Sequence, residues 1–301
     1  MASPQAIKLK EAFRMFRDQS LNKPQASMAE MRTNAVAFSN LTAEPTGVDC
    51  VAVDAGGVPA QWLTPQGAAM DRVILYVHGG GYVMMSAETH RKMVSHIAKA
   101  TGCRALNVDY RLAPEYPHPA PVNDAVTAYQ WLLGQGIKPS AIAIAGDSAG
   151  GGLCLATALK LRDLGVALPA ALVPISPWTD MESSGESMRT RAALDMIVSP
   201  AAISQISAMF LQGGSARDPY ASPLYANLKG LPPTYIQVGD EEVLLDDSVR
   251  FADLAKKAGV DITLEIFPEM QHVFQIAAGT MPEADAAISK IGAWLKVRLA
   301  L

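Results

Sequence analysis

One six-residue segment, Gly-Asp-Ser-Ala-Gly-Gly at 146–151, constrains the fold of this chain more than any other feature. It follows an apolar run at 141–145, which predicts a buried strand, and it precedes a run at 153–159, which predicts a helix. Gly-x-Ser-x-Gly between a strand and a helix is typical of a nucleophile elbow, a sharp turn that exposes its serine. We therefore expect Ser148 Oγ to stand above a sheet, at the positive end of a helix dipole.

Apolar, strand-like runs alternate with helical runs along most of the chain. The predicted strands are 48–53, 61–63, 73–77, 105–108, 142–145, 171–175, 235–238 and 264–267, and the predicted helices are 88–100, 123–133, 152–164, 201–211, 246–258 and 284–299. Strands that are apolar throughout are buried on both faces, and parallel sheets have this property. The pattern predicts an α/β fold, with a mostly parallel twisted sheet of about eight strands flanked by helices.

Two segments stand outside this alternation. Residues 1–45 contain an amphipathic helix that starts at Ser3-Pro4 and a second short helix near 28–32. Residues 182–214 interrupt the alternation later in the chain. We interpret 1–45 as a helical cap segment and 46–301 as the main α/β domain, with 182–214 contributing to the cap. For the N-terminal helices, packing on the main body and a lid over a pocket fit the sequence equally well.

Composition narrows the class of protein. Half of the 301 residues are hydrophobic, which supplies the core of one large domain. The net charge is −4 and no basic run is present, which argues against a nucleic-acid partner. The three cysteines match neither a zinc site nor a disulfide framework. No leader-like N-terminus and no uncharged apolar run of about 20 residues is present, so we expect a cytoplasmic protein without a membrane span.

A glycine-rich segment, His-Gly-Gly-Gly-Tyr at 78–82, follows the predicted strand 73–77. Three glycines allow the backbone to approach a substrate closely and to point N–H groups into a cavity. This is the pattern of the oxyanion loop of lipases and esterases. The N–H groups of Gly80, Gly81 and Ala149 are the candidate donors. A phosphate-binding loop is the alternative, but the Lys-Ser/Thr pair that it requires does not follow.

A serine nucleophile also needs a base, which must be one of five histidines. His78 belongs to the glycine-rich segment, and His90 and His96 fall on the next predicted helix. His118 lies among prolines. His272 directly follows the last predicted strand, where an α/β sheet places its functional residues. His272 is therefore the candidate base.

The acid that orients the base should follow the strand 235–238. The segment 239–247 offers five carboxylates there: Asp240, Glu241, Glu242, Asp246 and Asp247. Position alone does not choose among them, because acidic residues are also favoured at the start of a helix.

Three segments in this order resemble the hormone-sensitive-lipase family of α/β-hydrolases, in its bacterial branch. They are His-Gly-Gly-Gly at 78–81, Asp-Tyr-Arg-Leu-Ala-Pro-Glu at 109–115 and the elbow at 146–151. The order and spacing hold from about residue 48 to the C-terminus. The resemblance implies an α/β-hydrolase fold and hydrolysis of short-to-medium acyl esters, with a cap that limits chain length.

The resemblance also bears on the acid. In that family the acid opens an Asp-Pro-Leu-x-Asp segment, and Glu-Val-Leu-Leu-Asp at 242–246 occupies the matching place. Glutamate is an allowed triad acid in α/β-hydrolases. We therefore place Glu242 first, Asp240 second and Asp246 third.

The resemblance gives roles to further residues. It implies that Asp109, Arg111 and Glu115 brace the oxyanion loop through a buried ion-pair network. Tyr82 and Trp178 are candidates for lining the substrate pocket, although core packing explains Trp178 equally well.

Together these residues predict a serine carboxylesterase. Ser148 is the nucleophile, His272 the base and Glu242 the acid, with an acyl-enzyme intermediate. No cofactor or metal is expected, the partner is a small-molecule ester, and a homodimer is compatible with the fold. The same residues would serve a hydrolase of lactones, amides or carbamates. A non-catalytic ligand-binding protein on this scaffold would usually have lost the serine or the histidine, and nothing in the sequence favours an interaction protein.

Overall fold

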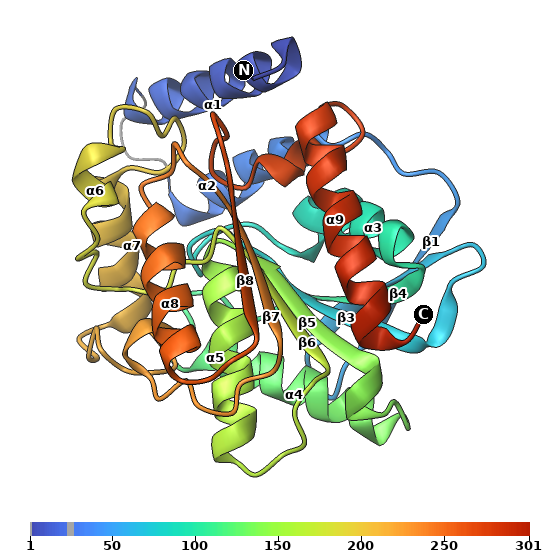
Figure 1. The fold of residues 1–301 in the computed structure, drawn as a ribbon. Coiled ribbons are helices and arrows are strands. Elements are labelled where there is room, and N and C mark those ends of the chain that lie inside the picture. The colour runs from blue at the N-terminus through green and yellow to red at the C-terminus, as the bar shows by residue number, and fades with distance from the viewer. Residues whose placement is uncertain (1, 23–26) are drawn as a thin grey trace.

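An eight-stranded sheet runs through the molecule in the order β1-β2-β4-β3-β5-β6-β7-β8, with helices on both faces (Figure 1). The computed structural model describes residues 2–22 and 27–301, so residues 1 and 23–26 of the predicted cap segment lie outside the described residues. The strands are β1 Val48–Asp54, β2 Pro59–Pro65, β3 Ala69–Val77, β4 Cys103–Val108, β5 Ile142–Asp147, β6 Ala171–Ile175, β7 Thr234–Gly239 and β8 Ile262–Phe267. Strands β3 to β8 are parallel, and β2 is antiparallel to both its neighbours. The predicted fold class is confirmed.

The central strands are buried on both faces, which explains why their sequences are apolar throughout. In β3, Val73 and Leu75 point into one core, and Ile74 and Tyr76 point into the core on the opposite face. All four side chains are fully buried. The edge strand β1 is mostly exposed, although its sequence is largely apolar.

The helices form two layers around the sheet (Figure 1). They are α1 Pro4–Asn22, α2 Met28–Ala35, α3 Ala87–Thr101, α4 Ala120–Gly134, α5 Ala149–Asp163, α6 Ser187–Thr190, α7 Pro200–Leu211, α8 Leu245–Lys257 and α9 Pro282–Leu299, with short 3₁₀ turns η1 Val36–Leu41, η2 Pro139–Ala141, η3 Pro223–Tyr225 and η4 Phe274–Ala277. Residues of α3 and α9 share one core, and residues of α4, α5 and α8 share the other. The sequence did not predict α6 or η1, because segments of four and six residues are too short to show a helical period.

Helix α1 packs over the end of the sheet where the parallel strands finish, across the top of the view in Figure 1. Its start is as expected, since Ser3 Oγ accepts the N–H of Ala6 at 3.1 Å and proline occupies the first helical position. Ala6 and Phe13 are buried on its inner face. Lys10 forms an ion pair of 2.7 Å with Glu241, which follows β7. The N-terminal segment therefore contacts a loop at the carboxyl edge of the sheet.

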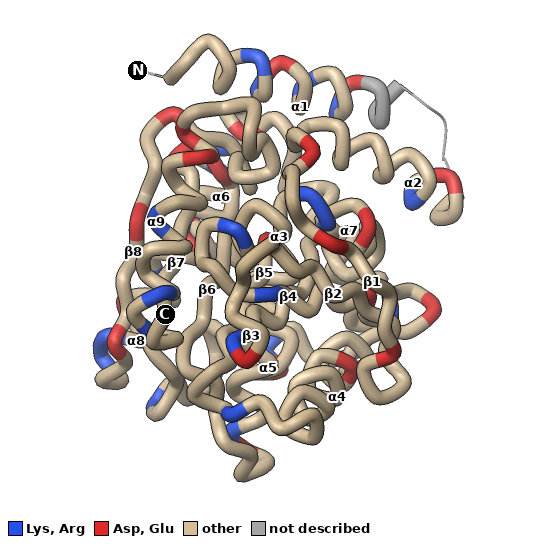
Figure 2. The backbone as a smooth tube through the Cα atoms, turned by 90° about the vertical axis from the view of Figure 1, so that its right-hand side faces the viewer, with Lys and Arg blue, Asp and Glu red and all other residues tan. Residues whose placement is uncertain are grey.

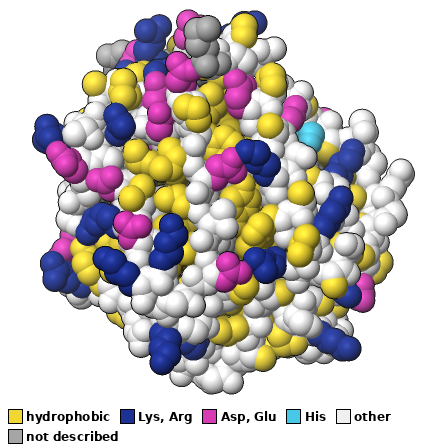
Figure 3. Space-filling view, in the orientation of Figure 1, with side chains coloured by type: hydrophobic (Ala, Val, Ile, Leu, Met, Phe, Trp, Pro, Cys, Tyr) yellow, Lys and Arg dark blue, Asp and Glu magenta, His cyan; other side chains and the backbone are white. Residues whose placement is uncertain are grey.

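The surface carries both signs of charge. Lysine and arginine are interspersed with aspartate and glutamate along the backbone (Figure 2). On the face shown in Figure 3, basic and acidic side chains are both scattered among apolar side chains. None of the helices within residues 2–22 and 27–301 has the length and apolar composition needed to cross a bilayer.

Candidate active site

The predicted elbow forms a tight turn between β5 and α5. Ser148 has φ 54° and ψ −122°, a strained conformation for any residue other than glycine. Two backbone hydrogen bonds hold it: Ser148 N–H donates to the carbonyl of Ile175 at 2.8 Å, and Trp178 N–H donates to the carbonyl of Ser148 at 2.9 Å. A Cβ atom at Gly150 would overlap the carbonyl oxygen of Val77, so this position requires glycine. Backbone strain of this kind is concentrated at functional sites, and here the surrounding hydrogen bonds maintain it at Ser148.

The serine lies directly before the first residue of α5 and is partly exposed, whereas Asp147 and Ala149 on either side are buried. The first N–H groups of a helix have no partner within the helix and carry its positive dipole. Ser148 and the N–H of Ala149 therefore share a place where negative charge is stabilised.

Asp147 ties the elbow to the glycine-rich loop. Its Oδ1 accepts the hydroxyl of Tyr76 at 2.8 Å and the N–H of Gly79 at 3.1 Å, and its Oδ2 lies 3.2 Å from Nε2 of His90. Burial raises the pKa of Asp147, but attraction to His90 and the hydrogen bonds from His90 and Tyr76 outweigh burial and lower that pKa overall. Asp147 is therefore a buried side chain that holds the elbow and the glycine-rich loop together.

The glycine-rich loop leaves two N–H groups unused. Gly80 and Gly81 have φ of 108° and 64°, which favour glycine. The carbonyl of Gly80 accepts the N–H groups of Val83 at 3.2 Å and Met84 at 2.9 Å, which closes the turn. Neither the Gly80 nor the Gly81 N–H meets an acceptor in the part of the chain that the structure describes. The loop thus presents two adjacent donors next to β3.

The side chain of His78 packs beneath the glycine-rich loop and has a structural role, so it does not act as the base. Its ring is fully buried and stacks on Tyr110 with centroids 4.3 Å apart. Its Nδ1 lies 2.7 Å from the carbonyl of Gly79, and Tyr110 Oη donates to the carbonyl of His78 at 2.7 Å. Burial, helped by the nearby His90, lowers the pKa of His78 to about 4, so its ring is neutral at pH 7.

The expected buried ion-pair network of Asp109, Arg111 and Glu115 was wrong, because all three residues are exposed. Arg111 pairs with Asp124 of α4 at 2.7 Å, and Glu115 pairs with Arg32 of α2 at 2.7 Å. Arg111 and Glu115 are exposed, and Asp109 accepts the first N–H of α3 at 2.9 Å. The partners lie in distant elements, and nothing in the local sequence pattern indicated them.

A buried hydrogen bond joins the predicted base to the predicted acid. Nδ1 of His272, after β8, lies 2.7 Å from Oε2 of Glu242, after β7. A carboxylate can only accept, so Nδ1 carries the proton and Nε2 is left to accept one. The other oxygen of Glu242 accepts the hydroxyl of Ser176 at 2.7 Å and the N–H of Gly239 at 2.5 Å. The Glu242 side chain is completely buried.

Ser176 is a residue that the sequence analysis missed. It follows β6 directly with φ 45°, and its Oγ also accepts the N–H of Val273, next to the histidine, at 3.3 Å. Ser176 therefore holds both the acid loop and the histidine loop. The sequence gives no signal for this, because a serine after a strand has many ordinary uses.

The other carboxylates of the acid loop have different partners. Asp240 accepts the N–H of Glu269 at 2.7 Å, and Asp246 accepts the N–H of Ser187 at 2.9 Å. Asp247 accepts the N–H of Thr179 at 2.7 Å. Among the five carboxylates in 239–247, all within the described residues, Glu242 is the one that hydrogen-bonds to His272.

Ser148, Glu242 and His272 follow the carboxyl ends of β5, β7 and β8, so they lie at one edge of the sheet. No hydrogen bond joins Ser148 to His272 among the described residues. In enzymes without substrate, such bonds are often long and tighten only in the complex. Burial lowers the pKa of His272, but attraction and a hydrogen bond from Glu242, with smaller contributions from other carboxylates, raise that pKa overall.

The two candidate pocket residues lie in the core. Tyr82 and Trp178 are each 1% exposed. Tyr82 stacks on Phe210 of α7 with centroids 3.9 Å apart, and Nε1 of Trp178 donates to the carbonyl of Asp180 at 3.1 Å. The Tyr82 side chain thus contacts α7 of the 182–214 segment, whereas the Trp178 side chain is fixed to the backbone just before that segment.

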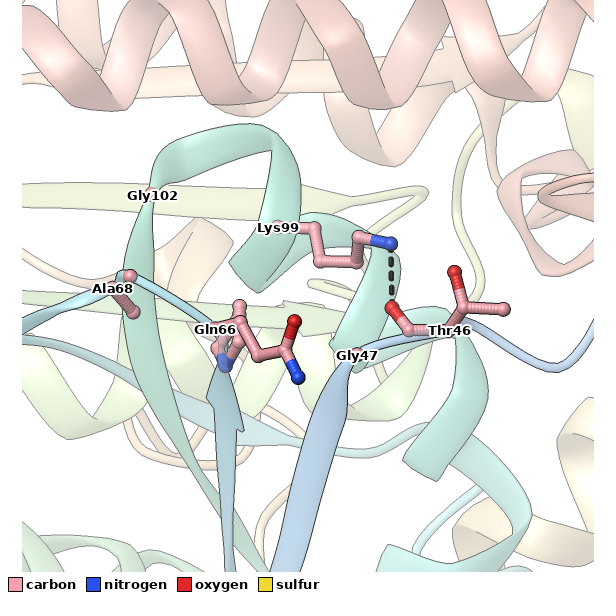
Figure 4. A pocket seen from close by; sticks show the side chains of 8 residues that line it. Thr46, Gly47, Gln66, Ala68, Lys99 and Gly102 are labelled. Atoms are coloured by element: carbon pink, nitrogen blue, oxygen red, sulfur yellow. Dashed lines mark hydrogen bonds between the residues drawn. The ribbon is translucent and has the colours of Figure 1, made fainter.

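A surface hollow of about 480 Å³ lies elsewhere, lined by residues 46–47, 65–68, 99 and 102 (Figure 4). These residues lie beside the starts of β3 and β4, at the opposite edge of the sheet from Ser148. Lys99, its one charged lining residue, donates to the carbonyl of Thr46 at 2.7 Å. The hollow contributes no residue to the site.

Comparisons with known proteins agree with this geometry. Residues 74–276 match the model of a family described by its alpha/beta hydrolase fold. An acetyl-hydrolase of Streptomyces hygroscopicus is 44% identical over 261 residues, which cover 86% of this chain and 85% of that protein. The structure of an esterase from the bacterial hormone-sensitive lipase family has a TM-score of 0.95 and 45% identity, and covers 99% of both chains. A further crystal structure, of a protein soaked with p-nitrophenyl butyrate, has a TM-score of 0.92 and 43% identity over the whole of both chains.

Proposed function

This chain belongs to the bacterial hormone-sensitive lipase family of α/β-hydrolases, and on that premise we propose that it is a serine carboxylesterase acting on short-to-medium acyl esters. The observation that carries the proposal is the buried 2.7 Å contact between Glu242 and His272. It lies at the same sheet edge as the strained elbow of Ser148 and the unused N–H groups of the glycine-rich loop.

In the proposed reaction, Ser148 Oγ attacks the ester carbonyl while its proton passes to Nε2 of His272. The carbonyl oxygen becomes an oxyanion, which the N–H groups of Gly80, Gly81 and Ala149 would hold. Removing one such donor typically costs roughly 2.7–4 kcal/mol of barrier.

His272 then gives its proton to the leaving alcohol, and the acyl group stays on Ser148. A water molecule attacks this acyl-enzyme while His272 takes one proton of the water. The bond between the acyl carbon and Ser148 Oγ then breaks, His272 returns the proton to Oγ, and the acid product leaves. In both halves Glu242 keeps the proton of the neutral ring on Nδ1 and stabilises the imidazolium.

We also propose that residues 1–45 and 182–214 together form the cap. Arg32 of α2 donates to the carbonyls of Val83 and Ala113, both at 2.9 Å, beside the glycine-rich loop. In the second segment, Ile206 of α7 lies next to Gly81. These contacts support a cap beside the proposed oxyanion donors, where its side chains would limit the length of an acyl chain.

The proposal is tested with p-nitrophenyl esters from acetate to palmitate. We expect kcat/KM to peak at short acyl chains, because the cap restricts the space beside the donors. A lactone, an anilide and an aryl carbamate are measured in parallel. Hydrolysis of one of these without hydrolysis of any ester would replace the esterase by the alternative hydrolase, and no turnover of any substrate would contradict the proposal altogether.

The pH dependence of kcat/KM follows from His272. The base must be neutral to accept the serine proton, and its carboxylate neighbours raise its pKa above the ordinary value of about 6.5. We therefore expect kcat/KM to fall as the pH is lowered, with a midpoint above about 6.5. The measurement is kcat/KM on a short-chain ester from about pH 5 to 9. A midpoint below the ordinary histidine value would contradict the assignment of His272.

A further inference from the structure

The loop between α6 and α7 reaches into the backbone that carries the acid. Asp195 of this loop is 1% exposed, although it belongs to the segment 182–214. Its Oδ2 accepts the N–H of Val243, the residue after Glu242, at 3.0 Å. Its Oδ1 accepts the N–H groups of Ile197 and Val198 at 3.0 and 2.8 Å, which fold the loop around the carboxylate. Asp195 therefore fixes the 182–214 segment to the acid loop.

The same loop is fixed to the residue before the histidine. Gln271 donates to the carbonyl of Leu194 at 3.0 Å and accepts the N–H of Met196 at 2.8 Å. These two partners flank Asp195 in sequence. The loop is thus bound to both loops of the acid–base pair, and Asp195 lies between its two contacts with Gln271.

Besides its hydrogen bonds to the backbone, the Asp195 carboxylate acts electrostatically on His272. Three N–H groups point at its oxygens, which suits a carboxylate and leaves no acceptor for a carboxyl proton among these contacts. Burial raises the pKa of Asp195 overall, and attraction to His272 is the largest of the effects that oppose burial. The charges that act on His272 come from Glu242, Asp195 and Asp147. The guanidinium of Arg17 donates to the backbone carbonyl of Asp195 at 3.5 Å, and among the described residues it makes no hydrogen bond with the Asp195 carboxylate.

We propose that Asp195 is a positioning residue for ester hydrolysis, which fixes the backbone of Glu242 and supplies a second negative charge to the His272 imidazolium. This inference rests on the proposed function of Ser148, Glu242 and His272. It makes the 182–214 segment part of the acid–base machinery as well as a wall of the pocket. A movement of this segment would then loosen the acid and remove charge from the base together.

The test is Asp195→Asn in the full chain, measured as kcat, KM and the pH profile of kcat/KM on a short-chain ester. The amide keeps the shape but removes the charge and can turn an N–H₂ group toward Val243 N–H. We expect kcat to fall roughly 10- to 100-fold, as small misplacements of catalytic groups typically cause. The KM should change little, and the acid limb of the profile should move to lower pH.

Two further variants separate charge, position and folding. Asp195→Glu keeps the charge but lengthens the side chain, so kcat should fall while the acid limb stays near that of the wild type. Asp285→Asn is the matched control, because Asp285 also accepts a backbone N–H, from Gly279 at 2.7 Å, but lies far along the chain on the exposed side of α9. Its kinetics should equal those of the wild type, and thermal melting checks that each variant is folded.

An Asp195→Asn enzyme that keeps kcat within about twofold of the wild type would overturn the proposal, because positioning effects of catalytic groups are larger. A lower kcat with an unmoved acid limb would also overturn it, because the role would then be structural. If Asp195→Asn does not fold, an unmoved kcat in Asp195→Glu has the same meaning. The wild type is measured first: if it hydrolyses no ester, the proposed function fails, and that result is distinct from any result with the Asp195 variants.

Discussion

Replacing Ser148 by alanine is expected to abolish ester hydrolysis and leave the protein folded. Removing the nucleophile of a serine hydrolase lowers kcat by roughly 10⁶-fold, because the remaining donors only stabilise the attack of water. The structure gives a reason for the fold to survive: the elbow is held by backbone hydrogen bonds to the N–H and carbonyl of residue 148, which alanine keeps. The melting temperature should therefore stay close to that of the wild type.

The measurement is kcat on a short-chain p-nitrophenyl ester, together with mass spectrometry of the acylated enzyme after rapid acid quenching. The wild type should carry one acyl group on the peptide that contains Ser148, and the variant should carry none. Ser95→Ala is the control, since this buried serine of α3 donates only to the carbonyl of Arg91. Residual activity of Ser148→Ala above about a hundredth of the wild type would contradict a covalent mechanism at this residue.

The sequence predicted the strands well for a physical reason. The central strands, such as β3, β5 and β6, contain runs of apolar residues bounded by turns, because burial on both faces imposes that pattern on the sequence. The helices with long apolar faces, such as α3 and α9, were found in the same way. The short elements α6 and η1 were missed, because their positions depend on contacts with the main domain and leave no period in the sequence.

The site divides along a similar line. The elbow and the glycine-rich loop are local sequence motifs, so Ser148, Gly80 and Gly81 could be identified as candidate site residues from a few consecutive residues. Supporting residues act through distant partners: Ser176 meets Glu242 across 66 positions of the chain, and Asp195 meets Val243 across 48. Such contacts depend on the fold, so a single sequence does not indicate which residue pairs with which. The expected burial of the network of Asp109, Arg111 and Glu115 was wrong, because exposure also depends on the fold.

The acid is the choice that the sequence left most open, and Glu242→Gln against Asp240→Asn is the experiment that decides it. The glutamine amide would replace an ionised oxygen beside Nδ1 by a neutral group and can favour the wrong tautomer of His272. An equivalent change in a serine protease lowers kcat about 10⁴-fold, and we expect a loss of roughly 10³- to 10⁴-fold here. The acid limb of kcat/KM should also move to lower pH, because attraction to Glu242 is the main effect that raises the pKa of His272.

Asp240→Asn is expected to change kcat by less than about threefold, as for a surface substitution. Asp240 accepts the N–H of Glu269 and is partly exposed, so an asparagine carbonyl can replace its oxygen. If the two variants exchange their effects, Asp240 is the acid and the buried contact of Glu242 serves only the fold. If both remain active within about tenfold, His272 does not depend on a carboxylate of this loop, and the proposed triad fails even where Ser148 proves essential. The pH profile separates these outcomes, because the raised pKa of His272 must be lost together with the acid that causes it.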